Sequence, residues 1–141
     1  MTAYESLNRV RNSKAEYERL LVKVEYLEAL AEKATPIISG MPRASAKAGQ
    51  SDDPWASLVD YKESCREQLT AYIRDCEALE KELNCIKSSR VRTAMKCRYI
   101  DLFTVSRIAA LMSMNERSAY RLLQRGVKIY TSLFEKGELN G

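Results

Sequence analysis

Arginine, tyrosine and glutamine side chains are concentrated in one short segment near the C-terminal end of the chain. Residues 116–125 contain three arginines, one tyrosine and one glutamine, mostly at intervals of three or four positions. That spacing places the side chains on one side of a helix. Guanidinium and amide groups pair with base edges in the major groove of DNA, and they also bind phosphates. We therefore predict a nucleic-acid-binding surface on this segment.

Nine residues are predicted to form that surface, in two roles. The first group is expected to face the bases: Arg117, Tyr120, Arg121 and Gln124. The second group is expected to hold phosphates or to cap the helix: Asn115, Glu116, Ser118, Arg125 and Lys128. We predict no enzyme, no cofactor and no metal site, because the sequence has no histidine, no Cys-x-x-Cys pair and no glycine-rich phosphate loop.

A shorter helical pattern precedes this segment, after a break of about three residues, which is the spacing of a helix-turn-helix. Its apolar residues share one face: Val105, Ile108, Ala109, Leu111 and Met112. In the second helix, Ala119, Leu122 and Leu123 are expected to be buried.

Side-chain caps are predicted at the start of both helices. Thr104 is the expected cap of the first helix, and Asn115 that of the second, with a Ser113–Glu116 capping box as the alternative. The apolar pattern continues to Phe134, so the second helix either runs on or bends at Gly126.

The segment resembles the helix-turn-helix of sigma-factor region 4. In that family an Ile-Ala pair, a Leu-Gly-Ile-like turn and a recognition helix follow in the order seen here in Ile108-Ala109, Met112-Ser113-Met114 and the residues after Asn115. Residues 97–104 are similar to the family's lead-in.

Two positions depart from the pattern of that family. Ser113 replaces the usual turn glycine, and Arg107 replaces an acidic residue. The layout of nearly the whole chain further resembles the ArpU/RinA-type late-gene regulators of phages of Gram-positive bacteria. That resemblance implies control of phage or prophage transcription, and a site of action in the cytoplasm of the bacterial host.

Charge is distributed unevenly along the 141 residues. The formal net charge is +4, yet residues 90–141 carry ten basic and four acidic side chains, so this segment is +6 and the rest sums to −2. A locally basic module is typical of proteins that bind polyanions, because each neutralised phosphate releases counterions. The charge pattern therefore agrees with the predicted surface.

Two long helices are predicted before the basic segment, giving an all-α fold with four regions. Residues 1–34 carry a long helix from about residue 3, which Pro36 ends, and residues 35–53 form a flexible loop rich in Pro, Gly and Ser. Residues 54–89 show strict heptad spacing and begin after an Asp52 or Asp53 cap. Residues 90–135 form the DNA-binding domain, and its first helix is expected to offer Lys96 and Arg98 to phosphates.

The heptad stripe of residues 54–89 predicts a coiled-coil seam, in which only Lys62 is polar. Its members are Trp55, Leu58, Lys62, Cys65, Leu69, Tyr72, Cys76, Leu79, Leu83 and Ile86. This seam either joins copies of the chain into a homo-oligomer or pairs with the first helix as a hairpin within one chain.

The four cysteines, Cys65, Cys76, Cys85 and Cys97, are expected to be reduced and buried in a cytoplasmic protein. No apolar run approaches the roughly 18–20 residues of a membrane span, and no signal-peptide pattern opens the chain.

Sequence-specific binding of duplex DNA in transcription control is the leading functional hypothesis. One alternative is a DNA-packaging adaptor similar to small terminases, which also join a helix-turn-helix to coiled-coil oligomerisation but assemble as rings. Another is a sigma-like factor that acts only with RNA polymerase. Oligomeric mass and binding of DNA by the isolated protein distinguish the three hypotheses.

Overall fold

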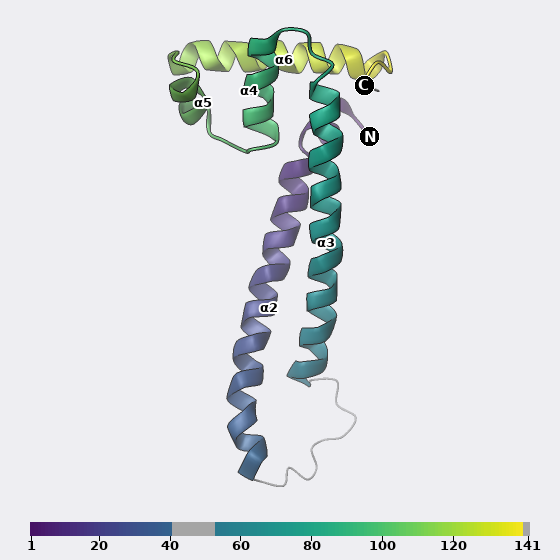
Figure 1. Cartoon of the computed structure of the whole chain (residues 1–141), viewed down its shortest axis with the longest axis vertical. Helices are drawn as coiled ribbons and strands as arrows, with labels where there is room; N and C mark the ends of the chain where they lie inside the picture. Colours follow the sequence, from purple (N-terminus) through teal and green to yellow (C-terminus); the bar gives the residue numbers. More distant parts are fainter. Residues whose placement is uncertain (41–52, 140–141) are drawn as a thin grey trace. The chain divides into compact units, whose positions relative to one another are not determined.

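A computed structural model describes residues 1–40 and 53–139, and for residues 34–40 it describes only the backbone. All regular elements in this part of the chain are helices, as predicted (Figure 1). They are α1 (Ala3–Leu7), α2 (Arg9–Gly40), α3 (Pro54–Leu83), α4 (Ser89–Tyr99), α5 (Val105–Leu111) and α6 (Glu116–Glu135).

The chain divides into two compact units, and the boundaries fall inside the two long helices. The terminal unit contains Met1–Lys14 and Ala71–Gly141, and the middle unit contains Ala15–Thr70. The terminal unit is therefore larger than the predicted DNA-binding region of residues 90–135, because both the start of the chain and the end of α3 fold with it.

The N-terminal helical pattern is interrupted once and extends further than expected. Thr2 caps α1 by accepting a hydrogen bond from the Glu5 N–H at 3.1 Å, and the Asn8 side chain then donates to the Tyr4 carbonyl at 2.9 Å. This local bond competes with the backbone ladder and separates α1 from α2. The predicted stop at Pro36 is wrong, since α2 runs to Gly40. A proline removes its own N–H donor and its ring crowds the carbonyl four residues earlier, but a helix can continue past such a residue.

Asp53 caps the start of α3, where its carboxylate accepts the Trp55 N–H at 3.0 Å, as expected for one of the two candidate caps. The predicted flexible loop of residues 35–53 is described only at its ends. Its central part, residues 41–52, lies outside the described residues.

In the middle unit, apolar side chains of α2 and α3 form one buried cluster. Its members are Leu20, Val24 and Leu27 from α2, and Leu58 and Cys65 from α3. Lys62, the single polar residue of the heptad stripe, forms an ion pair with Glu28 at 3.5 Å. Two further stripe residues are exposed, Trp55 by 47% and Leu69 by 37%. Trp55 and Leu69 are therefore not covered by the pairing of α2 and α3 within one chain.

The last part of the stripe is buried in the terminal unit, where α3 ends at Leu83 rather than at residue 89. Leu79, Leu83 and Ile86 are all buried there. Ile86 follows the helix in a turn, in which its N–H bonds to the Leu83 carbonyl at 3.1 Å. The Ser88 hydroxyl accepts the Val91 N–H at 3.3 Å and starts α4. A new helix cap therefore forms at Ser88, inside the range predicted for the heptad helix.

The core of the terminal unit lies where α4 and α6 cross, and Gly126 permits their close approach. A Cβ atom at Gly126 would lie 2.5 Å from Met95 Sδ and 3.1 Å from Val91 Cγ1. Met95 and Val91 are fully buried, so neither has free space to move into. The sequence left open whether this helix runs on or bends at Gly126. In the structure α6 runs on through Gly126.

We expect Gly126→Ala to destabilise the protein although alanine favours helices. The helical preference is worth about 1 kcal/mol, whereas forcing a methyl group against a packed core costs about 1–3 kcal/mol. Urea unfolding should show a lower free energy of unfolding for Gly126→Ala. Ser132→Ala, at an exposed position of the same helix, should change that free energy by less than about 0.5 kcal/mol. A more stable Gly126→Ala protein would contradict the close approach.

Candidate nucleic-acid interface

The connection between α5 and α6 is a tight turn built from local hydrogen bonds. The Thr104 hydroxyl accepts the Arg107 N–H at 3.2 Å, and the Asn115 side chain accepts the Ser118 N–H at 2.8 Å. Both predicted caps are therefore present, and Asn115 rather than the Ser113–Glu116 box caps α6. The chain reverses at Ser113, where φ is +55°. Glycine adopts this left-handed conformation without steric cost, whereas here a serine adopts it.

Buried apolar residues hold α5 and α6 against α4. Ile108 and Ala109 of α5, and Ala119 and Leu123 of α6, are buried as predicted, while Leu122 is half-buried. Leu111 was expected on the buried face but is 58% exposed. It is the last residue of α5, where the chain turns away from the core that Ile108 enters.

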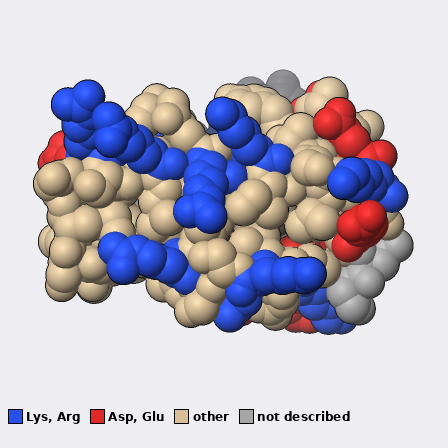
Figure 2. All heavy atoms as spheres, turned by 90° about the horizontal axis from the view of Figure 1, so that it is seen from above, with Lys and Arg blue, Asp and Glu red and all other residues tan. Residues whose placement is uncertain are grey.

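All nine predicted contact residues are exposed on α6 and its cap. They are Asn115, Glu116, Arg117, Ser118, Tyr120, Arg121, Gln124, Arg125 and Lys128. Within the described part of the chain, Arg117, Arg121, Arg125 and Lys128 form no ion pair with a carboxylate. We call these four residues the basic face. Figure 2 looks onto the side along which α6 runs and shows Lys and Arg spread widely, with most visible Asp and Glu toward one end.

Other cations of the terminal unit are engaged in structural contacts. Lys96 was expected to reach phosphates, but it pairs with Glu80 at 2.9 Å and donates to the Asn84 side chain at 2.7 Å. This ion pair with a carboxylate of α3 weakens the case for Lys96, and its contact with phosphates stays a prediction. The Arg107 guanidinium stacks on the Phe103 ring at 4.0 Å. The arginine at position 107 therefore has a packing role.

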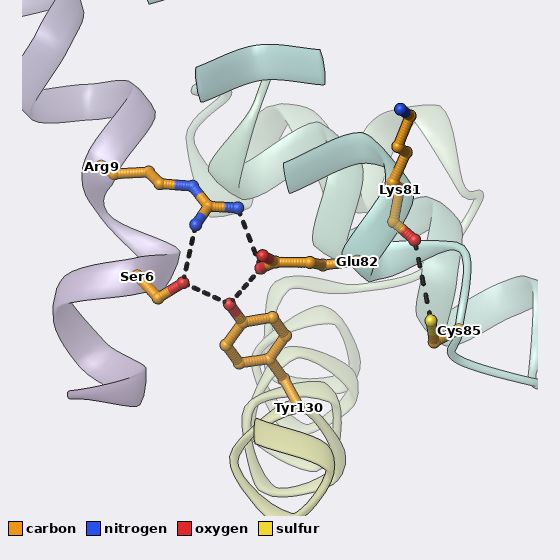
Figure 3. Close-up of polar contacts among 6 residues, drawn as sticks. All are labelled: Ser6, Arg9, Lys81, Glu82, Cys85 and Tyr130. Carbon is orange, nitrogen blue, oxygen red and sulfur yellow. Dashed lines mark hydrogen bonds and ion pairs between the residues drawn. The ribbon is translucent and has the colours of Figure 1, made fainter. Parts of the chain in front are cut away.

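A polar network in the core of the terminal unit contacts α6 through Tyr130 (Figure 3). The Tyr130 hydroxyl lies 2.6 Å from Ser6 Oγ and donates to Glu82 Oε1 at 2.6 Å. Arg9 donates to Ser6 Oγ at 3.1 Å and forms an ion pair with Glu82 at 2.9 Å. Residues from the start of the chain, the end of α3 and the middle of α6 are thus joined.

Sequence reasoning did not find this network. Ser6 and Tyr130 are 124 positions apart, and neither lies in a recognisable motif. The network holds the part of α6 that follows the basic face.

The network also perturbs the acidity of Tyr130. Burial raises the pKa of Tyr130 to about 12, and the hydrogen bond to Glu82 acts in the same direction.

Burial likewise raises the pKa of the Cys76 and Cys97 thiols above the ordinary value. The four cysteines are free thiols, but only Cys65 is buried, so the prediction that all are buried holds for one of them.

The described residues thus form an all-helical fold, and its terminal unit carries a basic helix, α6. The chain belongs to a family of proteins of unknown function, DUF1492, whose model matches residues 36–131. No curated protein and no solved structure matches it. Over residues 1–40 and 53–139, none of the helices combines the length and the apolar character needed to span a membrane.

We expect Tyr130→Phe to alter the response of stability to alkaline pH. Below pH 10 the Tyr130 hydroxyl is neutral in both the folded and the unfolded chain, and its contribution is complete. Between pH 10 and about 12 the unfolded chain ionises first, so the folded state loses this contribution as the pH rises. Chemical unfolding at pH 8 should show a loss of about 1–2 kcal/mol in the variant.

The difference between wild type and Tyr130→Phe should then shrink as the pH approaches 11.5. The comparison cancels the titration of the other tyrosines, which both proteins share. Parallel stability curves over this pH range would show that Tyr130 does not hold its proton through the network.

Proposed function

We propose that this protein binds duplex DNA through α6 and regulates transcription. The observation that carries the proposal is the basic face. Its four cations project from one side of a helix whose opposite side is buried, and no carboxylate neutralises them within the described residues. Cations in such an array are attracted to the regular phosphate spacing of a duplex.

The geometry around the basic face supports a helix-turn-helix mode of binding. α5 and α6 are joined by the residues from Met112 to Asn115, and α4 packs beneath both helices. In helix-turn-helix proteins the N-terminal residues of the second helix read base edges in the major groove. Arg117, Tyr120, Arg121 and Gln124 occupy the first three turns of α6, so they are the base-reading residues of the proposal.

The resemblance to phage late-gene regulators extends the proposal to transcription control in a bacterial host. The packaging-adaptor and polymerase-dependent hypotheses predict different assemblies.

We propose a small homo-oligomer, because helix-turn-helix regulators commonly bind two half-sites as dimers. Apolar side chains of α3 remain exposed in the middle unit, with Trp55 at 47%, Val59 at 66% and Leu69 at 37%. Such residues favour association through α3.

Arg121→Ala should weaken binding to a preferred DNA site by about 1–3 kcal/mol, because it removes a base contact. The site is first selected from a library of random duplexes with the wild-type protein. Fluorescence anisotropy then compares both proteins on the selected site and on a scrambled duplex. The loss should be larger on the selected site than on the scrambled one.

Arg66→Ala is the matched control for this measurement. Arg66 lies on α3, is 75% exposed in its side chain and pairs only with Glu63, so the charge change is the same. Equal affinity losses for the two variants would remove Arg121 from the base-reading surface. Absence of DNA binding by the wild-type protein would leave the polymerase-dependent hypothesis in first place.

Val59→Glu should lower the mass of the protein in multi-angle light scattering from that of a dimer or tetramer to that of a monomer. A carboxylate at the centre of an apolar contact is costly to bury. Val22→Glu is the control, because Val22 on α2 is also 66% exposed. A wild-type monomer would contradict the association, and a ring of eight or more copies would favour the packaging adaptor.

A further inference from the structure

An open groove of about 500 Å³ lies in the terminal unit, beside α6. Its walls come from the end of α4, the start of α5 and the flank of α6. Polar side chains that line it are Arg98, Tyr99, Tyr120, Gln124 and Lys128, and Leu123 is one of its apolar residues. Three of the five polar residues belong to the predicted contact surface, but Arg98 and Tyr99 belong to α4.

The groove is positively charged. Arg98 and Lys128 line it, and no lining residue is acidic. Neither cation forms an ion pair with a carboxylate in residues 1–40 and 53–139. The Arg98 guanidinium is half-buried, and its Nη1 donates to the Phe103 carbonyl at 2.9 Å. A cation held in this way has a fixed direction and keeps its charge to attract an anion, because a carbonyl neutralises no charge.

Tyr99 adds a hydroxyl donor to the same groove. Burial raises the pKa of Tyr99 above its ordinary value, while the nearby charges of Arg98 and Arg11 act in the opposite direction. The hydroxyl therefore keeps its proton at neutral pH and can donate to an anion. Arg11, from the start of the chain, contributes further positive charge close to Tyr99.

The length of the groove fits a strand better than a single small anion. Tyr120, Gln124 and Lys128 lie on successive turns of α6 and cover about 12 Å, at 1.5 Å per residue. B-form DNA rises about 3.4 Å per nucleotide along its axis, so more than one phosphate of a strand falls within that length. Lys128 also belongs to the basic face, so the groove continues the surface on which the duplex is proposed to lie.

We propose that this groove binds a stretch of one sugar–phosphate strand of duplex DNA, with phosphates at Arg98 and Lys128. The inference rests on the proposed function and deepens it, because it assigns sequence-independent contacts to α4. Contacts of this kind set the position of the protein on the duplex, whereas the first turns of α6 read its bases.

The salt dependence of binding tests the groove directly. Affinity for a random-sequence 40-base-pair duplex is measured between 50 and 200 mM salt for the wild type, Arg98→Met and Lys128→Met. Loss of one phosphate contact lowers the slope of log affinity against log salt by about 0.9. We expect this decrease in each variant, and the same decrease on a selected site, because phosphates do not depend on sequence.

Arg92→Met is a closely matched control for Arg98→Met. Arg92 also lies on α4, is half-buried and donates to a backbone carbonyl, that of Ile86 at 2.6 Å, but it does not line the groove. Its variant should keep the wild-type slope. Equal slopes for Arg92→Met and Arg98→Met, while the wild type binds DNA, would overturn the groove but not the proposed function.

Two other outcomes are also decisive. If thermal unfolding shows that Arg98→Met has lost its structure, Lys128→Met decides the question, because the Lys128 side chain is exposed. An unchanged slope in Lys128→Met would then overturn the proposal. A wild-type protein that does not bind the duplex even at 50 mM salt would overturn both the groove and the proposed function.

Discussion

The close approach of α6 to α4 at Gly126 is the constraint on which the rest of the terminal unit depends. No side chain separates the helices there, since even a methyl group would meet Met95. This contact fixes the rotation of α6 about its own axis. With Gly126, Ala119 and Leu123 directed into the core, the arginines of α6 can only point away from it. The basic face is thus a consequence of packing on the opposite side.

A second constraint joins the two ends of the chain. Tyr130, Ser6, Arg9 and Glu82 contact one another in a region where unpaired polar groups are costly, and the buried Arg9 Nε has no hydrogen-bond partner among the described residues. Arg9 forms an ion pair with Glu82, so this half-buried carboxylate does not depend on Tyr130 alone. The first residues of the chain are therefore part of the unit that carries α6, and the network holds the later turns of that helix while its first turns remain exposed.

The basic face and the groove divide the proposed DNA contacts between two helices. Side chains on the first turns of α6 are exposed and can adopt conformations that match base edges. Arg98, by contrast, is held by the Phe103 carbonyl and offers its charge in one direction. Specific recognition needs both kinds of contact, because phosphates set the register in which bases are read. α4 thus does more than support α6 from beneath.

Local interactions explain which features of the structure could be predicted from the sequence. The caps at Thr104 and Asn115 depend on residues within one helical turn, and the spacing of apolar residues in α6 marked its arginines as the exposed side, so the sequence could predict both. The packing at Gly126 then fixed which way that side faces. Distant contacts decided the rest. Lys96 is neutralised by Glu80 from another helix, and Ser6 meets Tyr130 across 124 positions. No local pattern encodes such pairs, because they arise only when helices far apart in the chain pack together.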